Sequence, residues 1–315
     1  MSDMRPDTRP VILVAQPHLA PMLAALAADY DVLPLWEEAG RARLTDAQAL
    51  VTAGEFRLDP ALLTAMPRLG LIACFTVGYD GVDLDWARAR GIAVTHAGDA
   101  NAEDVADHAI GLILAHRRQI VSGDRQLRAG GWVAGAKTIT RSLGDARLGI
   151  VGMGAIGLAI ARRAEVMRMQ VQWWGPRAKP ALGWPRADSL MALAQASDIL
   201  VVAAKADETN RGMIDAEIIA ALGPSGLLVN VARGQLVDED ALIAALRDGR
   251  LGGAALDVFA QEPTDAARWI DVPHIVLTPH TAGATDAAVA QMLAMLRANL
   301  SAYFAGEVLP SPVLG

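Results

Sequence analysis

Nine short runs rich in apolar residues recur along the chain. Within each run the apolar residues are mostly consecutive rather than alternating with polar ones. A strand with two apolar faces is typical of a parallel sheet that is covered by helices on both sides. The runs therefore predict nine buried parallel strands, at residues 11–15, 71–75, 92–95, 148–151, 170–174, 199–203, 227–231, 253–256 and 275–277.

Segments with helical periodicity lie between these strands. They predict helices at residues 102–116, 156–167, 215–222, 239–248 and 286–304. Alternating strands and helices indicate the α/β class, with right-handed crossovers between parallel strands.

Two of the helices indicate how the chain divides into domains. A chain of 315 residues has room for about two domains, and we expect the helices 102–116 and 286–304 to carry the chain from one domain to the other and back. We therefore predict two Rossmann-like, doubly wound parallel-sheet domains. Residues 1–100 and 286–315 form a discontinuous, flavodoxin-like substrate domain, and residues 101–285 form a dinucleotide-binding domain.

The composition narrows the class of protein. The chain is 53% hydrophobic and 20% charged, which excludes a disordered chain, and its net charge of -7 offers no basic surface for nucleic acid. No apolar run approaches the ~18 residues of a membrane span. The polar start of the chain, with Pro6 and Pro10, does not resemble a secretory signal. We expect a cytoplasmic protein without a nucleic-acid partner, a membrane partner or a metal site.

Cys74 is the one cysteine of the sequence. No intramolecular disulfide can form, which suits a reducing compartment. Because Cys74 lies within the apolar run 71–75, we predict a small buried hydrophobic side chain rather than a nucleophile.

A G-x-G-x-x-G pattern follows the predicted strand 148–151 and opens the helix 156–167. Gly152 allows a tight turn, Gly154 lets the backbone approach a pyrophosphate, and Gly157 lets the helix pack close to the strand. The helix N-terminus favours the negative phosphates. A glycine-rich turn without a ligand is the alternative, but the strand, the glycines and the helix agree with one another. The residues expected to bind the cofactor here are Gly152, Met153, Gly154, Ala155, Ile156 and Gly157.

The next strand indicates which cofactor is preferred. An acidic residue about 20 positions further on would accept hydrogen bonds from the adenosine ribose. Gly175 stands at that position, and residues 166–187 contain no Asp or Glu. Arg177 and Lys179 follow and can pair with a 2′-phosphate, although two solvated loop cations are the alternative. We predict that NADP(H) is preferred and that NAD(H) use is possible.

Three further polar residues follow predicted strands. Arg233, Glu262 and His280 come after the strands 227–231, 253–256 and 275–277. In open α/β sheets, ligands bind beyond the carboxyl ends of the strands, so these side chains are expected to converge on one crevice.

The three residue types suit the interconversion of a 2-keto acid and a 2-hydroxy acid. Arg233 can bind the carboxylate with its planar guanidinium and polarise the carbonyl. His280 can give a proton to the developing alkoxide or remove it in the oxidative direction. Glu262 can orient the imidazole and raise its pKa. Taken singly, each has the alternative of a surface ion pair or a capped loop.

The sequence resembles the D-isomer-specific 2-hydroxyacid dehydrogenase family over residues 11–313. The matching runs are residues 76–83, 149–157, 230–234, 256–263 and 278–280. The resemblance implies that Arg233, Glu262 and His280 are catalytic and that backbone amides at Val77 and Gly78 bind the substrate carboxylate. It also implies that Asp257 binds the nicotinamide carboxamide and that the protein is a homodimer with paired cofactor domains. The other residues expected beside the cofactor, from within or next to the matching runs, are Val231, Ala232, Arg233, His280 and Gly283.

Within the family, the sequence is most similar to the NADP-preferring glyoxylate, hydroxypyruvate and hydroxyphenylpyruvate reductases. Two positions depart from that group of reductases. The arginine that usually follows the second cofactor strand is shifted by one residue, to Arg177. Lys205 replaces a usually apolar residue in a loop beside the cofactor. Trp132 resembles a tryptophan that shapes the substrate pocket in some members, in some cases across the dimer. A packed interface aromatic is the alternative. We expect the remaining histidines, which match no catalytic position, to be structural or surface residues: His18, His96, His108, His116 and His274.

Three hypotheses follow. The leading one is an NADPH-dependent reductase of small 2-keto acids such as glyoxylate, hydroxypyruvate or an arylpyruvate. The second is an NAD-dependent dehydrogenase that works oxidatively, against which the missing acid at Gly175 speaks. The third is a non-catalytic, cofactor-sensing regulator on the same fold, against which the set of Arg233, Glu262 and His280 speaks.

Overall fold

The computed structural model describes residues 9–313, which divide into two compact units. The first unit comprises Met1–Asn101 and Asp286–Gly315, and the second comprises Ala102–Thr285. The undescribed ends of the chain include most of the polar start on which the signal-peptide expectation rests. Within residues 9–313, none of the helices combines the length and the apolar character needed to cross a lipid bilayer.

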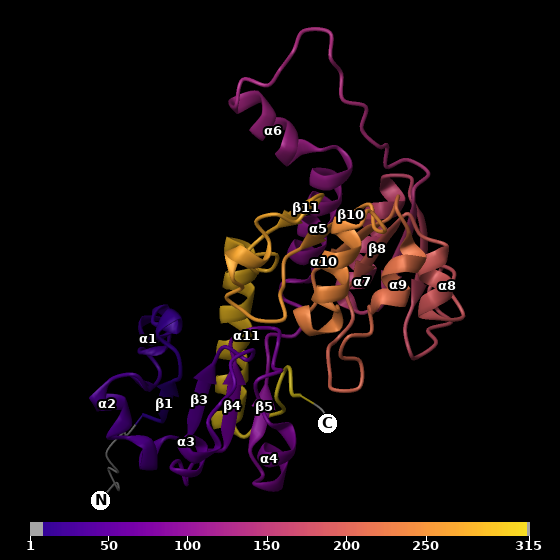
Figure 1. The fold of residues 1–315 in the computed structure, drawn as a ribbon. Helices are drawn as coiled ribbons and strands as arrows, with labels where there is room; N and C mark the ends of the chain where they lie inside the picture. The colour runs from indigo at the N-terminus through magenta and orange to yellow at the C-terminus, as the bar shows by residue number, and fades with distance from the viewer. Residues whose placement is uncertain (1–8, 314–315) are drawn as a thin grey trace, which may run out of the picture. The chain divides into compact units, whose positions relative to one another are not determined.

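The first unit is built on a five-stranded parallel sheet with the order β2-β1-β3-β4-β5 (Figure 1). This 2-1-3-4-5 order is that of flavodoxin-like folds. The strands are β1 (Val11–Val14), β2 (Asp31–Pro34), β3 (Ala49–Thr52), β4 (Leu71–Cys74) and β5 (Ala93–Thr95). The helices are α1 (Pro21–Leu26), α2 (Glu38–Arg41), α3 (Pro60–Thr64), α4 (Leu84–Ala89) and α11 (Asp286–Ala305).

Helices cover both faces of this sheet. Buried residues of α1 and α11 pack on one face, and residues of α3 and α4 pack on the other. Cys74 is buried in the second of these clusters, and burial raises the pKa of its thiol to about 12. A thiol that stays protonated is a poor nucleophile, so the prediction of a buried hydrophobic side chain is confirmed.

The second unit is built on a six-stranded parallel sheet with the order β11-β10-β9-β8-β6-β7. The strands are β6 (Arg147–Val151), β7 (Gln170–Trp174), β8 (Ile199–Val202), β9 (Leu227–Asn230), β10 (Gly253–Leu256) and β11 (Ile275–Leu277). Beyond β7 an isolated parallel bridge joins Trp173 to Arg186. If this bridge is counted as the third strand, the order from that edge to β10 is the 3-2-1-4-5-6 of dinucleotide-binding sheets, and β11 adds a seventh strand.

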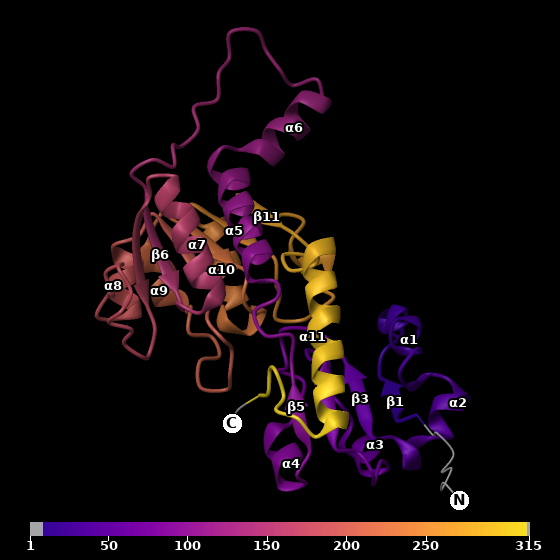
Figure 2. The same cartoon turned by 180° about the vertical axis from the view of Figure 1, so that it is seen from behind.

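Helices also cover both faces of the larger sheet. The helices are α5 (Ala102–Arg117), α6 (Ile120–Arg128), α7 (Ala155–Val166), α8 (Leu190–Gln195), α9 (Ala216–Leu222) and α10 (Glu239–Arg247). Figure 1 shows α8, α9 and α10 on the near face, and Figure 2 shows α5 and α7 on the opposite face. The predicted class, two doubly wound parallel-sheet α/β domains, is therefore confirmed.

The predicted strands are all present, with ends that differ by one residue where they differ at all. Two strands were not predicted, β2 and β3. The edge strand β2 is only partly buried and has Asp31 and Pro34 at its ends, so it forms no continuous apolar run. Proline is tolerated at a sheet edge, where its missing N–H need not pair. The strand β3 is fully buried, but it has only four residues, too few for periodicity to distinguish it from other apolar segments.

Candidate active site

The expected site residues of the second unit follow the carboxyl ends of strands in its sheet, three of which, β9, β10 and β11, are neighbours. The glycine turn follows β6, Arg233 follows β9, Glu262 follows β10, and His280 follows β11. Because all strands of this sheet are parallel, their carboxyl ends share one edge. The order of the strands places the glycine turn next to the topological switch point between β6 and β8.

Two glycines of the turn are required by the protein itself. Gly152 has a φ of +92°, and a Cβ there would lie 2.5 Å from the Cα of Ala204. A Cβ on Gly157 would lie 2.1 Å from the carbonyl oxygen of Gly152. A side chain at Gly152 would therefore clash with the loop after β8, and one at Gly157 would force α7 away from the turn after β6.

Gly154 is different, because a Cβ there would have no protein atom within 4 Å. It is the N-cap of α7 and makes no side-chain cap, so the amides of the first helical turn face open space. This is the cradle that a pyrophosphate fills in dinucleotide-binding folds. The residues of the turn thus fit the cofactor that the motif predicts.

A cluster of cations lies at the end of β7. Lys179 donates a hydrogen bond to the carbonyl of Met153, 2.7 Å away, and so joins this loop to the glycine turn. Arg186, which the sequence analysis did not single out, donates to the carbonyl of Gly175 at 2.8 Å, and its guanidinium lies over the ring of Trp173. Arg177 is exposed. Arg186 lies outside any regular strand and forms only an isolated bridge with Trp173. No hydrophobic pattern in the sequence could therefore place it beside β7.

The turn that carries Arg233 is held by a buried amide. The Oδ1 atom of Asn230 accepts from the amide of Ala232, and its Nδ2 atom donates to the carbonyl of Arg233. A Cβ on Gly234 would lie 1.8 Å from the carbonyl carbon of Phe259, so the turn and the loop after β10 are in direct contact. Sequence reasoning matched Asn230 to the family but assigned it no role.

Glu262 and His280 form the expected pair. The Nδ1 atom of His280 donates to Oε2 of Glu262 over 2.6 Å, and the Oε1 atom of Glu262 accepts from the amide of Phe259. Both side chains are about one third exposed. The Nε2 atom of His280 makes no hydrogen bond with any other residue in 9–313, so it is the ring atom left for a ligand.

The pair shifts the pKa values of both partners. The hydrogen bond from Glu262 raises the pKa of His280 above its ordinary value, against burial and the charge of Arg233, which lower it. Burial by itself would raise the pKa of Glu262, but the hydrogen bonds from His280 and the amide of Phe259 outweigh it, and the net pKa is lowered. The charge of Arg233 lowers both pKa values, which indicates that its guanidinium lies close to the pair.

Asp257 is 1% exposed and is bound mainly by protein donors. Its Oδ1 atom accepts from the hydroxyl of Thr278 at 2.6 Å and from the amide of Thr281, and its Oδ2 atom accepts from the amide of Ala282. Burial would raise its pKa, but these bonds and that of His108 outweigh it, and the net pKa is lowered. Asp257 therefore carries a negative charge that the surrounding donors stabilise.

Val77 and Gly78 belong to the first unit and follow β4. The carbonyls of the two residues accept from His96 and Thr76 respectively. Neither backbone amide donates to another residue in 9–313. Two amides without an internal acceptor suit the carboxylate binding that the resemblance implies.

Three other expected cofactor residues lie at the same edge. Val231 and Ala232 are buried at the end of β9, and Gly283 follows Ala282, whose amide is bound to Asp257. Lys205 lies in the loop after β8, across the switch point from the glycine turn.

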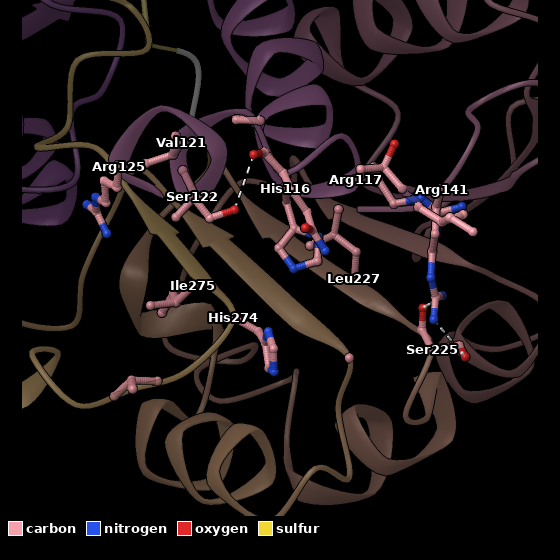
Figure 3. A pocket seen from close by; sticks show the side chains of 17 residues that line it. His116, Arg117, Val121, Ser122, Arg125, Arg141, Ser225, Leu227, His274 and Ile275 are labelled. Carbon is pink, nitrogen blue, oxygen red and sulfur yellow. Dashed lines mark hydrogen bonds between the residues drawn. The ribbon is translucent and has the colours of Figure 1, made fainter. Parts of the chain in front are cut away.

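Trp132 is the one expected site residue of the second unit that is not brought to this edge. Its side chain is 75% exposed on the segment after α6. The α6 helix borders a cavity of about 560 Å³ that is lined by the starts of strands, including Leu227 and Ile275, and by His116 and His274 (Figure 3). This cavity therefore lies at the amino edge of the sheet, opposite the site described above.

Comparison with known proteins assigns the family. The model of the D-isomer specific 2-hydroxyacid dehydrogenase NAD-binding domain matches residues 110–282. The chain is 38% identical to glyoxylate/hydroxypyruvate reductase A HPR2 of Arabidopsis thaliana, over 90% of this chain and 93% of that one. It is 39% identical to hydroxyphenylpyruvate reductase of Plectranthus scutellarioides, over 91% and 90% of the two chains.

Among solved structures, it is similar to the NADPH-dependent glyoxylate/hydroxypyruvate reductase of Sinorhizobium meliloti in complex with NADP and malonate. The TM-score is 0.88 and the identity is 36%, with 97% of each chain covered. The protein belongs to the D-isomer-specific 2-hydroxyacid dehydrogenase family. It is an oxidoreductase with a Rossmann dinucleotide-binding domain.

The geometry of the pair predicts the effect of neutralising Glu262. In Glu262→Gln the charged acceptor that raises the pKa of His280 is lost, so the imidazole should release its proton at a lower pH. The measurement is an NMR titration of the His280 ring proton, assigned by its absence in His280→Asn. Asp265→Asn is the control, because Asp265 is an exposed carboxylate that caps Ala267. An unchanged titration of His280 in Glu262→Gln would contradict the coupling.

Proposed function

We propose that the protein is an NADPH-dependent reductase that converts a small 2-keto acid, such as glyoxylate, hydroxypyruvate or an arylpyruvate, to the D-2-hydroxy acid. The observation that carries the proposal is the His280–Glu262 pair, joined over 2.6 Å at the same sheet edge as Arg233 and the glycine turn. The names of the relatives, reductases of glyoxylate, hydroxypyruvate and hydroxyphenylpyruvate, support this substrate class.

Arg233 and His280 have different roles toward the substrate. When bound, the cofactor supplies the hydride that reduces the carbonyl carbon. The guanidinium of Arg233 binds the carboxylate and polarises the carbonyl oxygen. The Nε2 atom of His280 gives its proton to that oxygen as negative charge develops on it. The backbone amides of Val77 and Gly78 add donors for the carboxylate.

Glu262 acts on the substrate only through His280. Its carboxylate holds the Nδ1–H bond, which fixes the orientation of the ring and leaves Nε2 for the substrate. Its charge also keeps the imidazole protonated to a higher pH. In the direction of reduction the protonated ring is the active form. The raised pKa of His280 therefore extends the pH range of reduction to higher pH.

The cations at the end of β7 support NADPH as the preferred cofactor. Gly175 presents no carboxylate, and Arg177 lies two residues beyond it. Lys179 is bound to the glycine turn, which keeps this loop next to the cradle for the phosphates. Arginine can bind a 2′-phosphate through two parallel hydrogen bonds. NADP bound to a structural relative is consistent with this preference.

The segment around α6 supports a homodimer. Five large apolar side chains are exposed within twenty consecutive residues: Ile120, Leu127, Trp132, Val133 and Ile139. In Figures 1 and 2 this segment projects away from the sheet of its own unit. So many exposed apolar groups in one short segment are typical of an interface. A second copy of the chain would bury them, and the resemblance of Trp132 to a pocket tryptophan of some family members suggests a contact with the partner's substrate pocket.

The first test of this function is a panel of assays. Glyoxylate, hydroxypyruvate and hydroxyphenylpyruvate are each incubated with NADPH and with NADH, and cofactor oxidation is followed by absorbance. His280→Asn should retain NADPH binding, yet its kcat should fall by a factor of about 10²–10⁴, the usual contribution of a general acid. Near-normal turnover in His280→Asn would contradict the role of His280. An absence of turnover with every substrate would overturn the function.

The cofactor preference gives a second test. Arg177→Ala should raise the KM for NADPH by at least about tenfold, because a charge-assisted hydrogen bond contributes roughly 1.5–3 kcal/mol. The KM for NADH should stay level. Adding Lys179→Ala should weaken NADPH further, and adding Gly175→Asp should favour NADH. A Cβ at Gly175 would meet only the Trp173 ring at an ordinary contact distance, so a side chain can begin there without a clash.

Arg250→Ala is the control for this test, because Arg250 is an exposed cation that precedes β10, at the opposite edge of the sheet. Equal weakening of NADPH and NADH in Arg177→Ala would mean that Arg177 only supports the loop.

The homodimer gives a third test. Leu127→Asp with Ile139→Asp should convert the dimer to a monomer, because each change places a charge in the buried interface. Mass is measured by light scattering after gel filtration. Val308→Asp is the matched control, because Val308 is 93% exposed, as Ile139 is, but belongs to the first unit. A double variant that remains dimeric would place the interface elsewhere.

A further inference from the structure

One face of α5 contacts the segment that carries His280. This segment, residues 278–285, follows β11 and is called the His280 segment below. Asp104 and His108 are four residues apart on α5, so their side chains lie on the same side of the helix, one turn apart. All these residues belong to the second unit.

The two side chains bind opposite ends of the His280 segment. The Nε2 atom of His108 lies 2.9 Å from the hydroxyl of Thr278, at the start of the segment. The hydroxyl of Thr285, at its end, donates to Oδ1 of Asp104 over 2.7 Å. The segment between these two points contains His280.

The chemistry of the Thr278 hydroxyl fixes the direction of its hydrogen bonds. It has one proton, which it donates to Oδ1 of Asp257 at 2.6 Å. It must therefore accept the hydrogen bond from His108, whose Nε2 atom carries a proton. The same Nε2 atom lies 3.4 Å from Oδ1 of Asp257. His108 thus adds a donor to a carboxylate that is almost fully buried.

Asp257 passes this support on to the backbone around His280. Its carboxylate binds the amides of Thr281 and Ala282, and its carbonyl oxygen accepts from the amide of His280. His280 has a φ of +53°, in the left-handed region that non-glycine residues rarely adopt. Such a conformation persists where the surroundings impose it. The amide of His280 also donates to the carbonyl of Thr278, so four hydrogen bonds to Asp257 and Thr278 hold this backbone.

We propose that His108 is a positioning residue for His280. It donates to Thr278, supports the charge of Asp257, and so holds the backbone from which the imidazole reaches Glu262. Asp104 secures the other end of the segment. This inference rests on the proposed role of His280 as the proton donor, and it assigns a function to a histidine that matches no catalytic position of the family.

The test compares two substitutions of His108. Leucine at this position cannot donate, whereas glutamine carries an amide nitrogen that can replace the Nε2–H donor. His108→Leu should lower kcat by about tenfold or more, since small misplacements of a reacting group can cost up to about 10²-fold. The KM for NADPH should change much less than kcat, because the glycine turn is untouched and Asp257 keeps its donors from Thr281 and Ala282. His108→Gln should restore most of the lost kcat.

Two further measurements separate positioning from a general loss of stability. In His108→Leu the NMR titration of His280 should move to lower pH, because a displaced ring loses part of its bond to Glu262. His108→Leu combined with Thr278→Val should lose no more kcat than the more damaging single change, because both act through one hydrogen bond.

Asp104→Asn and Asp107→Asn form a matched pair for the far end of the segment. Asp107 is on the same helix but exposed, and it pairs with Arg163. Only Asp104→Asn should lower kcat.

Several results would overturn the inference. One is wild-type kcat and an unshifted His280 titration in His108→Leu. Another is an equal loss in His108→Leu and His108→Gln that follows their melting temperatures, which would mean a purely structural role. His280→Asn is assayed in parallel. If its turnover is near normal, the proposed role of His280 as proton donor fails. If its kcat falls as expected while His108→Leu is normal, only this inference fails.

Discussion

A carboxylate removed from water must be surrounded by donors, and Asp257 imposes this requirement on the candidate active site. Desolvation of a charged group is costly unless hydrogen bonds replace the lost water. The donors that satisfy Asp257 come from the segment after β11, chiefly Thr278, Thr281 and Ala282. Satisfying one buried charge therefore determines the path of the backbone that carries His280.

Asp257 has an expected role in binding the nicotinamide carboxamide as well as organising the backbone. Oδ1 accepts from Thr278 and Thr281 and has the Nε2 atom of His108 3.4 Å away, while Oδ2 has one donor, from Ala282. Each carboxylate oxygen has about two acceptor sites, so Oδ2 retains one for a ligand. The expected contact with the carboxamide would use this site, so replacing Asp257 would then disturb both the backbone around His280 and the cofactor.

The sequence predicted those parts of the fold and site that depend on local pattern. Buried parallel strands such as β8 and β9 are short, fully apolar runs, and they were predicted within one residue. Gly152 and Gly157 could be assigned because the tight turn after β6 and the close approach of α7 to that turn each require a glycine at a fixed spacing. Arg233, Glu262 and His280 could be brought together because parallel strands end at one edge.

The parts that were missed depend on contacts between distant residues. His108 and Thr278 are 170 positions apart, and nothing in the helix around His108 indicates that its partner is a strand end. Arg186 lies on a strand reduced to a single bridge, which has no hydrophobic pattern of its own. For such residues the function follows from the packing of elements, and only the structure brings the partners together.

The bond that anchors the His280 segment to α5 also lies where the chain passes between the two units. The chain enters the second unit at Ala102 and leaves it after Thr285, and the bond between Asp104 and Thr285 joins the two crossings. Both ends of the His280 segment are therefore held by the helix that begins the same unit. The hydrogen bonds described for the His280 segment come from residues of the second unit, so this unit by itself orients the imidazole toward Glu262.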